Sequence, residues 1–247
     1  MKNIRAIGFD LFNTLITVEP PALNEALGRL VQSLKQSGFV LEEKRFQESY
    51  REAAARYVEA CKRDGKETHN RFWISSALGG QGYDVMPDDS RITDAVEAYF
   101  TAFYEYSRLI PGTKEMLGKV RPVYRLGLLT NFTHGPAARR IIEQLGLTPL
   151  FDAIIISGEI GYRKPNPLVF RQLRSHLRVL ETQIVHVGDD PEADVLGALN
   201  AGIQPVWVMH GHVSSFGSSP PQEPALPVGD VPAISSWREL LAMLALL

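Results

Sequence analysis

The sequence predicts an α/β protein in which a doubly wound parallel sheet carries an inserted helical domain. After Pro111, short apolar runs alternate with amphipathic stretches, the pattern of parallel strands joined by helical crossovers. One further apolar run, residues 4–10, is separated from those strands by a long helical stretch. Because this run fits the same sheet, the helices between are an insertion. We therefore expect a sheet domain over residues 1–16 and 109–247 and a helical domain over residues 17–108.

The helical domain is predicted from the spacing of its apolar residues. From Pro20 to about Arg108, charged and apolar residues alternate at helical spacing. Gly38 is expected to end the first helix, and the run GGQG at residues 79–82 is expected to break a later one. The last helix begins after the capping acids Asp88 and Asp89. These signals indicate four helices.

The rest of the sheet domain is predicted as alternating strands and helices. In chain order we expect a strand at 123–131, a helix at 134–146, a strand at 152–158, a helix at 166–177, a strand at 184–190, a helix at 191–202 and a strand at 205–210. The segment from His212 to Pro232 is rich in Ser, Pro and Gly, which predicts a surface loop. A closing helix is expected from Ser236.

Composition excludes several classes of protein. With 45% hydrophobic and 22% charged residues among 247, the chain is typical of a folded globular protein. A net charge of −2 gives no reason to expect nucleic acid or an anionic membrane as partner. The single cysteine, Cys61, excludes an internal disulfide and fits a reducing compartment. The sequence shows no signal-peptide pattern, and its longest apolar run is far below the roughly 18 residues that span a bilayer. We therefore expect a cytoplasmic protein.

Polar residues follow the predicted strands where each strand ends. In open α/β sheets ligands bind beyond the carboxyl ends of the strands, so these residues are placed to meet one substrate. Four segments carry them: IRAIGFDLFNTL with Asp10 and Thr14, LGLLTN with Thr130 and Asn131, GYRKPNPLVF with Lys164, and VHVGDDPEADVLGALNAG with Asp189, Asp190 and Asp194.

In residue type and order these segments resemble the motifs of the haloacid dehalogenase-like (HAD) hydrolases, which have a Rossmann-type sheet domain. The chain resembles the type in which a mobile helical cap follows the first motif, although between Val18 and Leu109 the resemblance is only architectural. It implies Asp10 as nucleophile and Lys164 as the lysine that neutralises charge. It also implies that the substrate is bound by Thr14, Thr130, Asn131 and Lys164.

The resemblance further implies a divalent metal. Mg²⁺ prefers oxygen ligands in octahedral geometry, from one or two carboxylates, waters and phosphate oxygens. The expected ligands are Asp10, the backbone carbonyl of Phe12, Asp189 and Asp194. Asp190 and Asp194 lie four residues apart at a helix start, so one of them can instead complement the helix dipole.

Phe12 departs from the family pattern. HAD phosphatases usually carry a second aspartate two residues after the nucleophile, which protonates the leaving oxygen and activates water. Phenylalanine can do neither, which leaves three interpretations. The first is a 2-haloacid dehalogenase, whose relatives carry an aromatic residue here. The second is a phosphohydrolase that acts on a good leaving group or takes its proton elsewhere, for example from His134. The third is a binding protein that retains the pocket.

Two mismatches count against the dehalogenase. Those enzymes need no metal and carry a serine and asparagine pattern where this chain has GDD at residues 188–190, and a tyrosine where it has Phe170. We therefore expect a Mg²⁺-dependent phosphohydrolase that acts on a small phosphorylated metabolite. The sequence predicts neither the oligomeric state nor the substrate.

Other rings are expected to be structural. His186 lies within an apolar strand, where it is expected to pack in the sheet. In the helical domain, His69 stands near Arg71, Phe72 and Trp73. This cluster is a candidate for contact with substrate, but we expect Phe72 and Trp73 to belong to the helical core.

Overall fold

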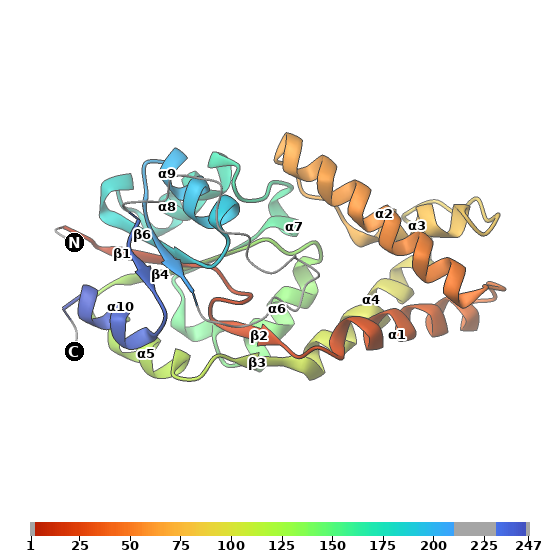
Figure 1. Ribbon diagram of the computed structural model, residues 1–247, viewed down its shortest axis with the longest axis horizontal. Helices are drawn as coiled ribbons and strands as arrows, with labels where there is room; N and C mark the ends of the chain where they lie inside the picture. The colour runs from red at the N-terminus through yellow and green to blue at the C-terminus, as the bar shows by residue number, and fades with distance from the viewer. Residues whose placement is uncertain (1–2, 210–230, 246–247) are drawn as a thin grey trace.

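The computed structural model describes residues 3–209 and 231–245, and it places a parallel sheet domain beside an elongated block of helices (Figure 1). Within these residues six strands form one sheet in the order β5-β4-β1-β6-β7-β8, with every neighbouring pair parallel. This confirms the predicted fold class. The strands are β1 (Ala6–Phe9), β4 (Arg125–Thr130), β5 (Ala153–Ile156), β6 (Ile184–Gly188), β7 (Gln204–Val208) and β8 (Ala233–Ile234).

Helices cover both faces of the sheet (Figure 1), which explains why the strands are continuous apolar runs. One helix packs so closely that a glycine is needed beneath it: a Cβ at Gly127 in β4 would lie 2.4 Å from Leu173 Cδ1. One face carries α8 (Pro167–Leu177) and α9 (Gly197–Asn200), and the other carries α5 (Thr113–Val120), α6 (Gly135–Gln144) and α10 (Trp237–Met243).

Four helices occupy the stretch between β1 and β4, as the apolar spacing predicts. They are α1 (Ala22–Gln36), α2 (Glu43–Asp64), α3 (Asn70–Gly79) and α4 (Ser90–Tyr106). Helix α1 packs along α4, and α2 packs against α3. The first helix ends near Gly38, whose φ of 93° lies in the left-handed region that favours glycine.

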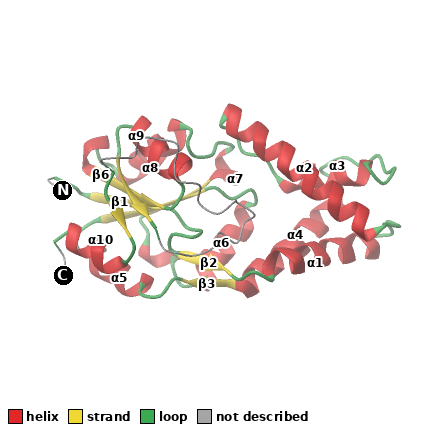
Figure 2. Ribbon diagram, in the orientation of Figure 1, coloured by secondary structure: helices red, strands yellow, loops and turns green. Residues whose placement is uncertain are grey.

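A short two-stranded ribbon joins the helical block to the sheet domain (Figure 2). Strand β2 (Ile16–Val18) pairs antiparallel with β3 (Ser107–Leu109), so the chain leaves and re-enters the sheet domain at adjacent points. The sequence analysis did not predict this ribbon, because three residues are too short for a periodic signal.

Several short elements were also not predicted. They are α5, α7 (Ser157–Ile160), β8 and two 3₁₀ turns, Thr148–Leu150 and Glu181–Gln183. The helix expected at 191–202 begins as a π-helical turn, Pro191–Leu196, before α9. Residues 212–230 of the predicted loop at 212–232 lie outside the described residues. Within the described ranges, no helix is both long and apolar enough to cross a membrane.

Candidate active site

The register of the three central strands brings the predicted site residues to one edge. Phe9 in β1 pairs with Leu128 in β4 and with Val187 in β6. Asp10, Thr130 and Asp189 follow these three residues within two positions. Side chains from segments far apart in the chain therefore meet beyond the carboxyl ends of the strands, where open α/β sheets bind ligands.

Lys164 joins two of the acids. Its Nζ donates to Asp10 Oδ1 at 2.5 Å and to Asp194 Oδ1 at 2.6 Å. All three residues are buried. Burial opposes the charge on Lys164, but the two carboxylates outweigh it and hold the pKa of the lysine above its usual value. The lysine is therefore a fixed cation beside the predicted nucleophile.

Asp10, Asp189 and Asp194 form a carboxylate cluster. One oxygen from each lies within 4.8 Å of the others. Burial raises the pKa of Asp10 to about 7 and that of Asp189 to about 8, and the neighbouring acids add to both shifts. Burial also acts on Asp194, but Lys164 and His186 outweigh it and lower its pKa to about 2. Because three acids share one lysine, the cluster favours an additional cation.

The main chain around Asp194 is shaped to hold this carboxylate. A Cβ at Gly188 would lie 2.2 Å from Asp194 Cγ, so only glycine fits there. His186 Nε2 lies 2.7 Å from Asp194 Oδ1, and the backbone N–H of Asp190 donates to Asp194 Oδ2 at 3.2 Å. Asp194 itself lies in the π-helical turn, a deviation that often marks functional sites. His186 is thus buried in the sheet, as expected, but it also positions an acid.

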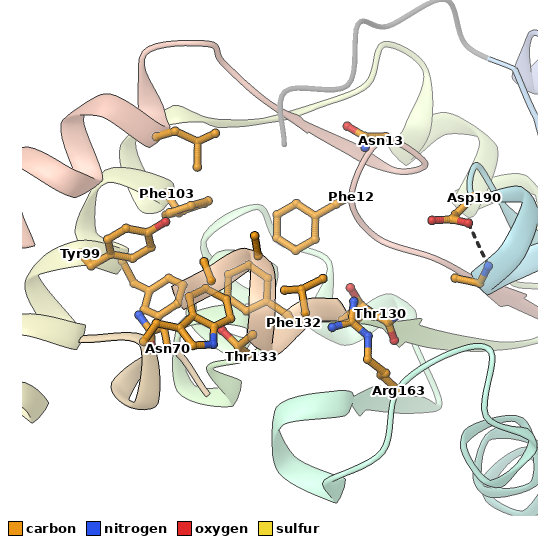
Figure 3. Close-up of a pocket in the computed structure, with 18 of the residues that line it drawn as sticks. Phe12, Asn13, Asn70, Tyr99, Phe103, Thr130, Phe132, Thr133, Arg163 and Asp190 are labelled. Atoms are coloured by element: carbon orange, nitrogen blue, oxygen red, sulfur yellow. Dashed lines mark hydrogen bonds between the residues drawn. The ribbon is translucent and has the colours of Figure 1, made fainter. Parts of the chain in front are cut away.

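Asp190 has a different role from its neighbours. Its Oδ1 accepts hydrogen bonds from the backbone N–H groups of Glu192 and Ala193 at 2.8 and 2.9 Å, and Figure 3 draws one hydrogen bond at Asp190 as a dashed line. Asp190 therefore caps the helical turn. Of the two acids that the sequence left open, Asp194 is the one that lies in the carboxylate cluster.

The predicted substrate-binding residues differ in what they contact. Thr14 Oγ1 donates to Asp189 Oδ1 at 3.3 Å. Thr130 Oγ1 is buried in the cavity wall and has no hydrogen-bond partner among the described residues, so it is placed to donate to a bound oxygen. Asn131 instead brackets Lys164: its Oδ1 accepts from the Lys164 N–H at 2.8 Å, and its Nδ2 donates to the Lys164 carbonyl at 3.0 Å. This contact positions the lysine, and direct binding of substrate by Asn131 stays a prediction.

Trp207 is a supporting residue that the sequence analysis missed. Its Nε1 donates to the backbone carbonyl of Asp189 at 2.9 Å. Trp207 lies on β7, which neighbours β6 in the sheet. A tryptophan within a strand gives no sequence signal for this contact, because it depends on which strands are neighbours.

A cavity of about 830 Å³ lies between this edge of the sheet and the helical block. The site acids and Lys164 line one end, and Phe12 separates that end from an aromatic wall that includes Phe103 and Tyr99 (Figure 3). The Phe12 ring stacks on Phe132 with centroids 4.9 Å apart and an interplanar angle of 10°. An apolar ring therefore occupies the place where the family usually has an acid. That the Phe12 carbonyl binds metal stays a prediction.

The histidines of the helical interface lie elsewhere. His134 is not among the residues that line the cavity. Its Nε2 lies 2.8 Å from Glu97 Oε1, its Nδ1 lies 3.0 Å from His69 Nε2, and its ring stacks on Phe100. His134 therefore joins α6 to the helical block, and nothing in its position supports the role of proton source for which the sequence made it a candidate.

The two aromatic residues beside His69 differ from each other. Both are half-buried, but Trp73 packs against the hydrophobic core, as expected, and also lines the cavity. Phe72 is not among the described residues of either core cluster.

A second set of contacts, at Glu67, joins the helical block to the sheet domain. Glu67 Oε1, in the loop between α2 and α3, lies 3.2 Å from Arg163 Nη1. Its Oε2 accepts a hydrogen bond from Ser157 Oγ. The loop that carries Lys164 is thus tied directly to the helical block.

Comparison with known proteins agrees with this geometry. The ribulose-1,5-bisphosphate 5-phosphatase of Halopiger xanaduensis is 29% identical over 203 residues, which cover 81% of this chain and 83% of that protein. The N-acylneuraminate-9-phosphatase of Homo sapiens is 30% identical over 229 residues, which cover 89% of this chain and 88% of that protein. A solved 2-haloacid dehalogenase from Pseudomonas syringae pv. tomato DC3000 has the same fold, with a TM-score of 0.72, 23% identity and 98% of both chains covered. The family model for haloacid dehalogenase-like hydrolases matches residues 4–202, and the chain therefore belongs to this family of hydrolases.

Proposed function

We propose that the protein is a Mg²⁺-dependent phosphohydrolase that acts on a small phosphorylated metabolite through Asp10. The observation that carries the proposal is the carboxylate cluster, in which the buried Asp10 and Asp194 are paired with Lys164 and the half-buried Asp189 is not. A dehalogenase that attacks carbon needs no such surplus of acids. Relatives of similar length are phosphatases of small phosphorylated compounds by name, which supports the same chemistry.

The residues of the cluster fit a hard divalent cation. Asp10, Asp189 and Asp194 would hold it, with the Phe12 carbonyl as a further oxygen ligand. When bound, the cation would neutralise charge between the nucleophilic carboxylate and the anionic phosphoryl group. Thr14 and Trp207 would orient Asp189 in that cluster.

The reaction then uses the chain's own residues in two steps. A carboxylate oxygen of Asp10 attacks phosphorus, the bond to the leaving oxygen breaks, and an aspartyl phosphate forms. The ammonium group of Lys164 stabilises the negative charge on the phosphoryl oxygens, and the Thr130 hydroxyl donates a hydrogen bond to one of them. Water then attacks phosphorus, which releases phosphate and restores Asp10. Since Phe12 offers no proton to the leaving oxygen, substrates with good leaving groups are favoured.

We assign the helical block, residues 17–108, as a cap that encloses substrate against the sheet domain at residues 1–16 and 109–247. The cavity lies between these two parts, and ribbon β2–β3 joins them. A cap of this kind excludes water from the aspartyl phosphate. We place the enzyme in the cytoplasm, because its single cysteine suits a reducing compartment and a phosphorylated metabolite is a substrate of the cell interior.

Phe12 keeps one alternative open, a 2-haloacid dehalogenase that uses Asp10 on carbon. The deciding experiment assays acetyl phosphate, 4-nitrophenyl phosphate, glycerol 3-phosphate and L-2-chloropropionate, each with Mg²⁺ and with EDTA. Asp10→Asn serves as the control, because it keeps the size of the side chain and removes the nucleophile. We expect phosphate release that requires Mg²⁺ and is lost in the control. Chloride release that persists in EDTA would instead establish the alternative.

A further inference from the structure

Arg163 is a cation of the cavity that the two-step reaction does not use. In the described part of the chain, the positively charged side chains that line the cavity are Lys164, Arg51 and Arg163. Lys164 is taken by Asp10 and Asp194, and Arg51, in α2, is exposed. Arg163 directly precedes Lys164 in the chain, and only 18% of its side chain is exposed.

The helical block holds Arg163 in place. Nη1 of the arginine lies 3.2 Å from Oε1 of Glu67, whose side chain is 2% exposed. The guanidinium also lies beside the thiol of Cys61 in α2. The backbone is fixed as well, since the Arg163 N–H donates to the Gly65 carbonyl at 3.1 Å and the Glu67 N–H donates to the Gly161 carbonyl at 2.9 Å. Arg163 therefore has a defined orientation while the helical block is seated on the sheet domain.

Glu67 is fully engaged, whereas Arg163 has donors left. The two carboxylate oxygens of Glu67 also accept from the Thr68 N–H and from the Ser157 hydroxyl. A guanidinium carries five N–H donors in a rigid fork. Neither Nε nor Nη2 of Arg163 is among the sealed polar atoms that lack a partner within the described residues, so these donors stay accessible. In Figure 3 the Arg163 side chain points into the pocket, toward Thr130.

The charges of the site favour a further cation here. A phosphoryl dianion brought to the carboxylate cluster adds to its negative charge, and Lys164 with one divalent cation does not offset the total. The planar fork of an arginine matches the oxygens of a phosphate, to which it can donate two hydrogen bonds. Because the loop that carries Arg163 also carries Lys164, the two cations reach the same end of the cavity.

We propose that Arg163 is a substrate-binding residue that donates hydrogen bonds to phosphoryl oxygens, and that Glu67 is a positioning residue that orients it from the helical block. This inference rests on the proposed phosphohydrolase function. The charges that meet the phosphate all stay on the sheet domain. Their arrangement depends on the helical block, because Arg163 loses its orienting partner when the block moves away.

The test measures binding of inorganic phosphate by calorimetry in the presence of Mg²⁺, which needs no turnover. Arg163→Met removes the guanidinium, and we expect phosphate affinity to fall on the order of 10–100-fold, the range for hydrogen bonds to charged groups. Glu67→Gln keeps the shape of the partner without its charge and should cost less. Binding of Mg²⁺ without phosphate should stay unchanged in both variants, because neither side chain belongs to the carboxylate cluster.

A double variant separates phosphate binding from damage to the fold. Arg163→Met leaves the Glu67 carboxylate buried without its cation, which should lower the free energy of unfolding. Adding Glu67→Gln removes that buried charge and keeps an acceptor for the Ser157 hydroxyl. The double variant should therefore recover stability without recovering phosphate affinity. A merely structural role for the pair predicts that both recover together.

Arg139→Met is the matched control. It makes the same substitution in another arginine–glutamate pair, that of Arg139 with Glu159, and Arg139 is not among the described residues that line the cavity. An exposed pair of this kind contributes little to stability. Phosphate affinity in Arg139→Met should equal that of the wild type.

The outcomes distinguish this inference from the function on which it rests. Wild-type phosphate affinity in Arg163→Met, or its return in the double variant, would overturn the inference and leave Mg²⁺-dependent hydrolysis by the wild type intact. If the wild type binds phosphate through Arg163 but hydrolyses no phosphate ester, the inference stands and the function fails. A wild type that binds no phosphate in the presence of Mg²⁺ would contradict both.

Discussion

The two ends of the cavity are built on different physical grounds. At the sheet edge Lys164 is paired with Asp10 and Asp194. At the helical end the cavity wall consists largely of aromatic and small apolar side chains, such as Phe100, Phe103 and Ala54. Charges fixed by their partners suit a reaction that is the same for every substrate. An apolar wall that surrounds the rest of the substrate suits the choice of one substrate. Chemistry and selectivity are thus carried by separate parts of the chain.

The largest effect should come from breaking the charged end. Lys164→Met leaves the buried carboxylates of Asp10 and Asp194 without their cation. We expect the free energy of unfolding to fall by about 3–5 kcal/mol and turnover to fall on the order of 10²–10³-fold. Denaturant unfolding and steady-state assays measure both. Lys62→Met, at an exposed lysine in α2, is the control and should change little. Wild-type stability in Lys164→Met would show that the acids do not depend on the lysine.

The second prediction separates neighbouring acids. Asp189→Asn weakens a ligand in the cluster, so a higher Mg²⁺ concentration should be needed for half-maximal activity. Loss of a residue that only supports a metal ligand typically costs roughly 10–100-fold in metal affinity, and we expect the loss of a ligand to cost at least as much. Asp190→Asn is the matched control, because asparagine also caps a helix. Its Mg²⁺ titration should follow the wild type. Equal shifts in both variants would remove the distinction between ligand and cap.

The third prediction tests the ring that divides the two ends. Phe12→Asp places a carboxyl group where the family protonates the leaving oxygen, so activity on an alkyl phosphate should rise relative to an aryl phosphate. The change in this ratio should reach at most about 10²-fold, the lower end for general acid catalysis, because the new carboxyl lacks supporting hydrogen bonds. Phe12→Leu controls for loss of the stack on Phe132. A folded Phe12→Asp protein with an unchanged ratio would contradict the phosphohydrolase assignment.

The smallest effect concerns the helical interface. Burial, with the nearby His134 and Arg71, lowers the pKa of His69 from 6.5 to about 4. The folded state then binds fewer protons than the unfolded state between these pH values, so stability is full above pH 6.5 and falls as the pH drops toward 4. His69→Asn retains an acceptor for the Arg71 N–H without titrating.

Thermal unfolding at pH 7 and pH 5 measures this effect. Between pH 7 and pH 5 the Tm of the wild type should fall further than that of His69→Asn. We expect the two decreases to differ by no more than about 2–4 °C, which corresponds to 1 kcal/mol at this chain length. Partial exposure of His69 limits the effect further. A variant with the same pH dependence as the wild type would place the titration on other groups.

The sequence predicted the sheet domain and its charged edge because both depend on local signals. Apolar runs that end in Asp10, Thr130 and Asp189 mark strands and place the acids at one edge without any knowledge of packing. Strand β2 was missed because three residues carry no period. Helix α5 was missed although its buried residues Thr113, Met116, Leu117 and Val120 stand at helical spacing, because the helix is only eight residues long. The roles of His134 and Trp207 were also beyond reach, since each depends on which elements lie side by side.

The same limit applies to the helical end of the cavity. Asn70 has no motif around it, and its burial beside Tyr50 in the cavity wall depends on how the helices pack. Asn131 shows the converse. Its type and position predicted a substrate contact, whereas its amide is engaged by the backbone of a residue that is distant in the chain. Residue types at strand ends could be predicted, but the partner that each side chain chooses could not.

The place of β1 in the sheet has a consequence for synthesis of the protein. This strand precedes β4 and β6 in the chain, yet it lies between them and pairs with residues as late as Val187. At about 5–20 residues per second, a nascent chain keeps one edge of β1 unpaired for on the order of ten seconds or more. Such distant pairing slows folding and exposes an apolar strand meanwhile. The nucleophile is thus synthesised early and assembled late, so no partial chain ending before β6 contains the complete site.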